Sequence, residues 1–288
     1  MNDQIITSHE LAEELKKTEE SVFKSMTGMP TLDRLLGGVE AGELVIVTGP
    51  SGEGKTTMLM SITQNMANEG VDSVWFTLEV TPRQFIQKMT RTEKLPLFYI
   101  PRNGIDTADP EFVKAWEKNY KKRYEMIDWI EVKILEAQAK AAAEGRNLRC
   151  VFIDHIHQIF SIERVERNIS LELGDMVAKI KKIAVENNIV VFLVAHNKDP
   201  QEGATLREPR KEDIRDSGLI VRLADTVIGV WRIPNDDDGT AARRKVIAED
   251  DNKAKIRVFK NRREGKLGSF VMYHIDHFLT EDAFVGDF

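Results

Sequence analysis

The sequence predicts an α/β fold in which helices cover both faces of an open, mostly parallel sheet. Apolar runs at 148–154 and 189–195 are almost uninterrupted, which is typical of parallel strands buried on both faces. Between them, segment 170–186 has apolar residues at three- and four-residue steps, as one face of a helix requires. A glycine-rich turn follows the apolar run 44–48 and precedes a helix-compatible stretch, so strands and helices alternate along the chain.

In chain order, residues 1–25 are expected to form an N-terminal arm and residues 26–288 one larger domain. Thr7 and Glu10 have the spacing of a capping box, so a short helix should begin in the arm and dock either on its own domain or on a neighbouring subunit. The larger domain first alternates between strands at 44–48, 71–78, 97–100, 148–154 and 189–195 and helices at 57–66, 81–89, 109–123, 127–144 and 170–186. Three later strands, at 225–231, 255–260 and 268–274, extend the sheet as an antiparallel edge.

The composition is that of a globular protein. Hydrophobic residues make up 42% and charged residues 31% of the 288 positions, which excludes a disordered chain. The net charge of −6 gives no basic signature, so any nucleic-acid site has to be a local patch. The single cysteine, Cys150, favours the cytoplasm or an equivalent reducing interior. We expect neither secretion nor membrane insertion, because the N-terminus lacks a signal pattern and no apolar run approaches about 18 residues.

A phosphate-binding pattern lies at the centre of the chain. Residues 49–56 read G-P-S-G-E-G-K-T, which fits G-x-x-x-x-G-K-T between a strand and a helix. Glycines let backbone N–H groups approach phosphate oxygens, and the helix start adds partial positive charge. We expect Lys55 at the β- and γ-phosphates of ATP, or of another nucleoside triphosphate, and the Thr56 hydroxyl on Mg²⁺. The predicted nucleotide-binding residues are Gly49, Pro50, Ser51, Gly52, Glu53, Gly54, Lys55, Thr56 and Thr57.

Three polar side chains end apolar runs, where open α/β sheets bind their ligands. Asp154 is the expected Mg²⁺-holding carboxylate, and Glu79 is expected to activate or orient the water that attacks the γ-phosphate. His196 is the expected sensor of that phosphate. A solvated strand-end glutamate and a structural histidine are the competing interpretations of Glu79 and His196. His155 and His157 have no cysteine nearby, so we interpret them as structural rather than as a zinc site.

Two basic segments follow. Loop 197–211 is longer than a core connection needs, and its basic residues are suited to nucleic-acid phosphates: Lys198, Arg207, Arg210 and Lys211. Because the loop also carries acidic residues, a merely solvated loop is the alternative. The predicted hairpin turn 260–266 carries Lys260 and Arg262, and a cation at such a tip can reach a phosphate on another subunit.

In this order, the motifs resemble the RecA-like ATPase domain of DnaB-type hexameric replicative helicases, including those of phages and mitochondria. The resemblance covers residue 26 to the C-terminus and depends on 27–33, the phosphate loop, 78–79, 152–155, 195–196, 213–218, 224–225 and 260–262 with Gly265. It implies a RecA-like P-loop NTPase fold with Glu79, Lys55, His196, Lys260 and Arg262 in catalysis, the last two acting on the neighbouring subunit's nucleotide. Loop 197–213 would line a central channel for single-stranded DNA.

The resemblance also implies a function. We expect an ATP-dependent DNA helicase or translocase that acts on single-stranded DNA as a ring-shaped homo-oligomer, a hexamer, in DNA replication. Primase, polymerase or loader proteins are the implied partners, and the arm resembles a linker helix packed on the adjacent subunit. Two other functions stay open at this point: a RecA-like recombinase that exchanges strands, and a ring-forming signalling ATPase that does not bind DNA.

Overall fold

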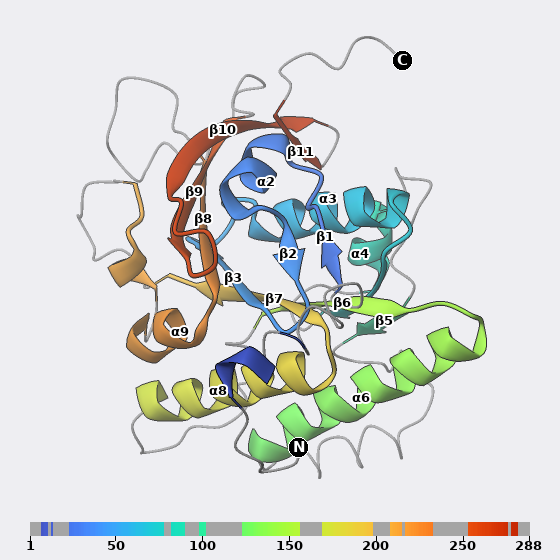
Figure 1. Cartoon of the computed structure of the whole chain (residues 1–288). Coiled ribbons are helices and arrows are strands. Elements are labelled where there is room, and N and C mark those ends of the chain that lie inside the picture. The colour runs from blue at the N-terminus through green and yellow to red at the C-terminus, as the bar shows by residue number, and fades with distance from the viewer. Residues whose placement is uncertain are drawn as a thin grey trace, which may run out of the picture.

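A mixed sheet organises the computed structural model (Figure 1), which describes residues 7–10, 13, 23–77, 82–89, 98–101, 123–155, 169–197, 208–214, 217–232, 253–275 and 278–281. Its nine strands lie in the order β11-β10-β9-β8-β3-β7-β6-β4-β5. Their bounds are β3 Leu44–Gly49, β4 Asp72–Thr77, β5 Phe98–Pro101, β6 Leu148–Asp154, β7 Val190–His196, β8 Thr226–Arg232, β9 Lys253–Asn261, β10 Gly268–Ile275 and β11 Phe278–Thr280. A separate pair joins β1 (Lys24–Ser25) to β2 (Val39–Glu40).

The strand directions confirm the predicted parallel core and antiparallel edge. β3 pairs in parallel with β7 and β8, and β6 pairs in parallel with β7 and β4. From β8 onward, each neighbour pairs antiparallel through β9, β10 and β11. The predicted strands are found within about two residues of their expected bounds, because continuous apolar runs identify strands that are buried on both faces.

Helices cover both faces of the sheet (Figure 1). One core lies under α6 (Arg123–Ala143), α8 (Ile169–Glu186) and α9 (Ser217–Leu223). The other lies under α2 (Pro30–Leu36), α3 (Lys55–Asn68) and α4 (Pro82–Met89). In that second core, the rings of Trp75, Phe152 and Phe192 stack across three neighbouring strands, with centroids 5.0 and 4.8 Å apart. Such packing fixes the strands relative to one another, and so fixes the positions of their ends.

Some elements were not expected from the sequence. The short helices α2 and α9, of seven residues each, and the strand β11 are additional to the predicted set. The helix predicted at 57–66 begins two residues earlier, at Lys55, directly after the phosphate loop. The helix predicted at 109–123 falls almost entirely outside the described residues.

In the arm, Thr7 and Glu10 form the predicted capping box. The backbone N–H of Thr7 donates to Glu10 Oε2 (2.8 Å), and the N–H of Glu10 donates to Thr7 Oγ1 (3.2 Å). The docking of the arm stays a prediction, because most of it lies outside the described residues. Among the helices described, none is long and apolar enough to cross a membrane.

Candidate active site

The carboxyl ends of the parallel strands bring the start of the phosphate loop, Asp154 and His196 to one edge of the sheet. Gly49, which begins the phosphate loop, pairs with His196 at the end of β7. Asp154, which ends β6, pairs with Thr77 at the end of β4. Glu79 itself lies outside the described residues, but it follows Thr77 by two positions. Gly49, Asp154 and His196 therefore lie at the same edge of the sheet, where open α/β sheets bind their ligands.

The phosphate loop needs glycine where it approaches other strands. At Gly49 (φ 151°), a Cβ atom would lie 2.2 Å from the carbonyl oxygen of Val230 in β8. At Gly54 (φ 100°), the residue before α3, a Cβ atom would lie 2.8 Å from the His274 ring in β10. Gly52 (φ 80°) is open, with nothing within 4 Å of such an atom. Glycine thus allows close packing at two positions and leaves space at the third.

Lys55 and Thr56 begin α3 in positions that suit a bound triphosphate. The Lys55 ammonium donates to the carbonyl oxygens of Gly49 (2.9 Å) and Pro50 (2.6 Å), which hold it against the loop. The Thr56 hydroxyl donates to Asp154 Oδ2 at 2.6 Å, and Asp154 is 1% exposed. A hydroxyl and a carboxylate at this separation are oxygen ligands of the type that Mg²⁺ prefers, so the residues present fit the ion.

His196 connects this site to the loop that follows it. Its ring packs edge-on against the buried His155 ring, with centroids 4.0 Å apart and planes at 82°. The next residue, Asn197, accepts a hydrogen bond from the Thr48 hydroxyl through its side-chain oxygen (2.7 Å) and pairs with Ile214 in an isolated antiparallel bridge. That bridge joins the two ends of loop 197–213 beside β3. Because this loop is predicted to bind single-stranded DNA, we call it the strand-binding loop. His157 lies outside the described residues.

Of the four predicted DNA-binding cations, Arg210 and Lys211 are described and exposed, whereas Lys198 and Arg207 lie outside the described residues. Glu208 fixes the end of this loop on β9, because its carboxylate accepts from Lys255 Nζ (2.8 Å) and Arg257 Nη1 (2.9 Å). No local pattern in the sequence predicts this contact, since 47 positions separate Glu208 from Lys255.

Two strand residues beside the phosphate loop were also missed. The backbone N–H of Arg232 donates to the Glu53 carboxylate at 2.5 Å, which ties the loop to the end of β8. The His274 imidazole packs against Gly54. Burial and the Arg232 charge lower the pKa of His274 to about 4, so the ring is neutral at pH 7. The only signal in the sequence is a histidine inside a strand, which is insufficient to identify a partner.

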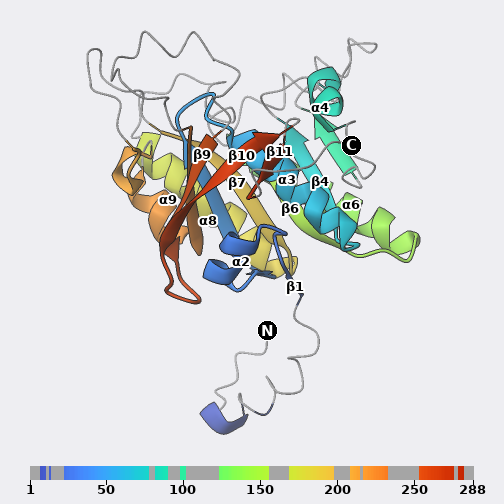
Figure 2. The same ribbon diagram turned by 90° about the horizontal axis from the view of Figure 1, so that it is seen from above.

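The predicted trans-acting cations lie at the other end of the sheet. The backbone N–H of Arg262 donates to the Asp225 carbonyl oxygen (2.9 Å), and Arg262 Nη1 lies 3.4 Å from the Asp225 carboxylate. That carboxylate accepts from the N–H of Leu44, the first residue of β3. Figure 2 shows the β9–β10 turn opposite the loop that joins β3 to α3. Because β3 rises about 3.3 Å per residue, Arg262 lies roughly 16 Å from its own phosphate loop.

The neighbouring basic residues of this turn have structural contacts. Lys260 Nζ donates to the carbonyl oxygens of Val221, Arg222 and Ala224 and so caps the C-terminus of α9. Burial and the Arg262 charge lower the pKa of Lys260. Arg263 donates to Glu40, Glu43 and backbone carbonyls of residues 36–38, which fixes the turn on α2 and β2. Of Lys260, Arg262 and Arg263, it is therefore Arg262, with a side chain that is 62% exposed, that projects outward.

In sequence, the chain is similar to replicative DNA helicases. The replicative DNA helicase DnaC of Bacillus subtilis is 25% identical over 237 residues, covering 81% of this chain and 52% of that protein. The replicative DNA helicase DnaB of Mycoplasma pneumoniae is 26% identical over 248 residues, covering 82% and 52%. The chain therefore spans about half the length of these curated relatives.

Solved structures confirm the predicted RecA-like fold of DnaB-type ATPase domains. One ATPase domain matches with a TM-score of 0.68 at 17% identity, over 96% of this chain and 99% of that domain. A DnaB-like replicative helicase, described with its interactions with primase, matches with a TM-score of 0.64 at 16% identity, over 96% of this chain and 67% of that one. A family match in sequence covers residues 25–281. The chain belongs to the family of the DnaB-like helicase C-terminal domain.

Proposed function

We propose that this chain is an ATP-driven motor that moves along single-stranded DNA as a ring of identical subunits and separates duplexes during replication. The proposal depends on one observation: the two parts of the predicted catalytic site, which we call half-sites, lie at opposite ends of the same strand. The phosphate loop lies at the carboxyl end of β3, and Arg262 lies beside the amino end of the same strand. A subunit of this shape needs a neighbour to complete its site.

The nucleotide half-site has groups for each part of a triphosphate. Lys55 would neutralise the β- and γ-phosphates, while the loop N–H groups would bind their oxygens. Thr56 and Asp154 would hold Mg²⁺, which supplies positive charge to the phosphates when bound. Glu79 would orient or deprotonate the attacking water, as its position two residues after Thr77 suggests. The proposed substrate is ATP or another nucleoside triphosphate.

The second half-site would act from the adjacent copy. Arg262 would stabilise the charge that develops as the γ-phosphate leaves, because its guanidinium is exposed and held by Asp225. Lys260 would assist from the same turn after leaving the carbonyl groups that it caps. Head-to-tail contacts of this kind close into rings, and we propose a hexamer.

The conformational change caused by hydrolysis would be transmitted to the strand-binding loop through His196. Loss of the γ-phosphate would change the surroundings of His196, and Asn197 would pass that change to the loop that ends at Arg210 and Lys211. The family assignment favours this helicase function over the recombinase and the signalling ATPase. The solved neighbour was studied with its primase, and we propose primase as a partner here too, with polymerase and loader proteins as further candidates.

The test combines two assays on the wild-type chain and on Lys55→Ala. Phosphate release is measured with and without single-stranded DNA, and unwinding is measured on forked duplexes with 5′ or 3′ tails. We expect single strands to stimulate hydrolysis several-fold, unwinding from one tail polarity, and neither activity in Lys55→Ala. Hydrolysis that is indifferent to DNA, with no unwinding from either tail, would instead support a signalling ATPase.

A further inference from the structure

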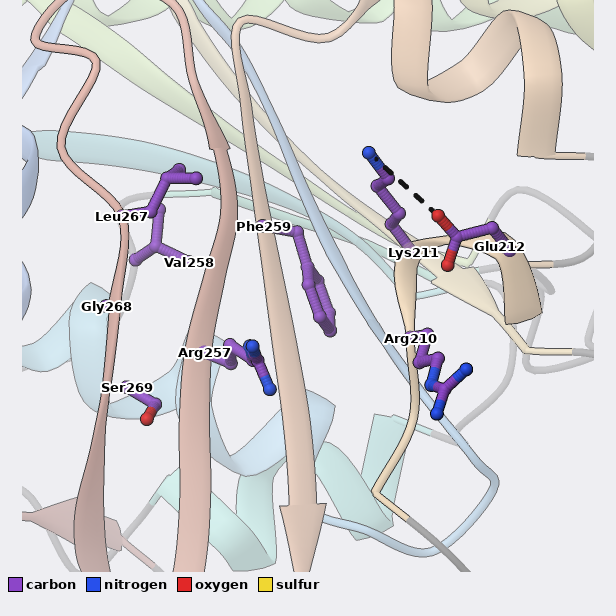
Figure 3. Close-up of a pocket in the computed structure, with 9 residues that line it drawn as sticks. All are labelled: Arg210, Lys211, Glu212, Arg257, Val258, Phe259, Leu267, Gly268 and Ser269. Atoms are coloured by element: carbon purple, nitrogen blue, oxygen red, sulfur yellow. Dashed lines mark ion pairs between the residues drawn. The ribbon is translucent and has the colours of Figure 1, made fainter.

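A pocket of about 660 Å³ opens beside the end of the predicted strand-binding loop (Figure 3). One wall is the segment 210–212, just before the bridge between Ile214 and Asn197. The other wall is formed by 257–259 of β9 and 267–269 around the start of β10. No phosphate-loop residue lines the pocket, so it is distinct from the nucleotide site.

The pocket is basic although the chain as a whole is acidic. Arg210, Lys211 and Arg257 line it, against a single lining carboxylate, Glu212. Glu212 lies 3.9 Å from Lys211, and both side chains are more than half exposed (65% and 57%), so this pair is weak. The Arg210 side chain forms no ion pair with any described residue. A local excess of positive charge therefore faces the pocket, in a chain with net charge −6.

Glu208 positions Arg257 without using up its donors. A guanidinium has five N–H donors, and Glu208 accepts from Nη1 alone among these nitrogens. The Arg257 side chain is 51% exposed, so its remaining N–H groups stay available to a ligand. An arginine held in this way loses little conformational freedom when it binds an anion.

An aromatic ring lies among these cations. In Figure 3, the Phe259 ring lies between Arg257 and the pair Arg210 and Lys211. Its orientation depends on Gly229, where a Cβ atom would come within 2.3 Å of the ring. Arg257 Cζ lies 5.8 Å from the ring centroid, and Leu267, 59% exposed, adds apolar surface at the pocket. A fixed ring beside three cations suits a ligand that has both flat apolar groups and phosphates.

The geometry points to a second contact for single-stranded DNA in this pocket, and this inference rests on the proposed function. Phosphates bind Arg210, Lys211 and Arg257, and one base packs against Phe259. The volume lies within the range of roughly 300–1,000 Å³ that is typical of small-molecule sites, which is enough for a short stretch of strand. An acidic peptide would satisfy the cations but would make no use of the aromatic surface.

The experiment measures binding of a fluorescent oligo(dT) by anisotropy, with Mg²⁺ and a slowly hydrolysed ATP analogue, over a series of salt concentrations. The variants are Arg257→Gln and Phe259→Leu, and the control is Arg34→Gln, which removes an exposed guanidinium from α2 on the opposite face. Loss of one phosphate contact should reduce the slope of log K against log salt by about 0.7. Phe259→Leu should weaken oligo(dT) about fivefold while hardly changing binding of an abasic strand.

Each outcome is informative. If the wild type does not bind oligo(dT) at any salt concentration, the proposed function fails. If the wild type binds but Arg257→Gln keeps the affinity and slope of the control, the pocket assignment fails and the proposed function stands. Because Phe259 packs on Gly229, thermal unfolding is measured for each variant, and Arg257→Gln decides the result if Phe259→Leu is unstable. Equal binding of poly-glutamate, with the same dependence on Arg257 and Phe259, would make the ligand an acidic peptide and overturn the assignment.

Discussion

The two ends of the parallel sheet differ in how they are built. At the carboxyl end, the site combines main chain, glycines and short side chains such as Thr56 and Asp154 with the ammonium group of Lys55. At the amino end, long charged side chains form a network around Asp225, whose carboxylate accepts from Leu44 N–H and Lys181 Nζ and lies beside Arg262. One end is shaped to surround phosphates, whereas the other fixes a cation so that it points outward.

This difference suggests how a catalytic site can be divided between two subunits with the same fold. The length of β3 keeps Arg262 away from its own phosphate loop, which is why we propose that it acts on the nucleotide of another subunit. In the proposed assembly, the network at Asp225 would orient the cation before the neighbour binds, which would reduce the entropy lost on forming the complete site.

The largest expected effect is at the phosphate end. Lys55→Ala removes the charge that the loop carbonyls of Gly49 and Pro50 hold in place, so hydrolysis should fall below detection and nucleotide binding should weaken. Phosphate release and binding of a fluorescent nucleotide are the measurements, and Lys182→Ala on exposed α8 is the control. Persisting turnover would show that the phosphates bind elsewhere.

Arg262→Ala should affect hydrolysis and nucleotide binding differently, and so distinguish the roles of the two ends of the sheet. Hydrolysis should fall about a thousandfold, because a trans-acting arginine stabilises only the transition state. Nucleotide affinity should stay close to that of the wild type, because the phosphate loop is untouched. A parallel loss of affinity and hydrolysis would instead place Arg262 in the binding site of its own subunit.

Asp225→Asn tests whether the charge of Asp225 stabilises the network of side chains at the amino end of the sheet. Substitution leaves the Lys181 ammonium, which is 23% exposed, without its carboxylate, and should lower the free energy of unfolding by about 2–3 kcal/mol. Urea denaturation measures this change. The control is Asp128→Asn, which removes the more exposed partner of Lys179 and should cost less than about 1 kcal/mol. Equal losses in both variants would contradict a special role for Asp225.

The smallest effect concerns Glu208, which joins the predicted strand-binding loop to β9. Burial raises the pKa of Glu208, but Lys255 and Arg257 outweigh it and lower that pKa below 4.5. Because the pKa is lower in the folded state, the carboxylate contributes stability above the unfolded pKa, and this is lost as pH falls through the folded pKa. Glu208→Gln should cost under about 1 kcal/mol at pH 7, since the pairs are partly exposed. A stability difference that persists after pH has fallen through the folded pKa of Glu208 would contradict this origin.

The parallel core could be predicted because its strands are continuous apolar runs, and their polar ends then define one edge. Asp154 and His196 followed from that rule, whereas Gly49 followed from the phosphate-loop pattern. The helices α2 and α9 could not be predicted, because two turns give too little periodicity to distinguish a helix from a loop.

The other features that could not be predicted from the sequence depend on tertiary contacts. Arg262 and Arg263 are adjacent and chemically identical in sequence, yet Arg263 is bound to α2 and β2 and Arg262 projects outward. Some contacts join residues that are far apart in the sequence, such as Lys181 with Asp225 and Gly54 with His274. Local sequence patterns cannot predict them, because they form only when the sheet forms. The sequence therefore predicts the types of residue in the proposed site, and the fold shows which individual side chains are placed to serve in it.

The division of the site between copies is tested most directly by mixing two inactive variants. Lys55→Ala keeps the cation and Arg262→Ala keeps the phosphate loop, so random mixing in one ring makes about one interface in four complete. The two chains are co-expressed with different tags, and phosphate release is measured on doubly purified mixed oligomers. Hydrolysis that recovers in the mixed oligomers, while each variant alone stays inactive, is the predicted result. Mixed oligomers that remain as inactive as their parents at every ratio would contradict a site shared between subunits.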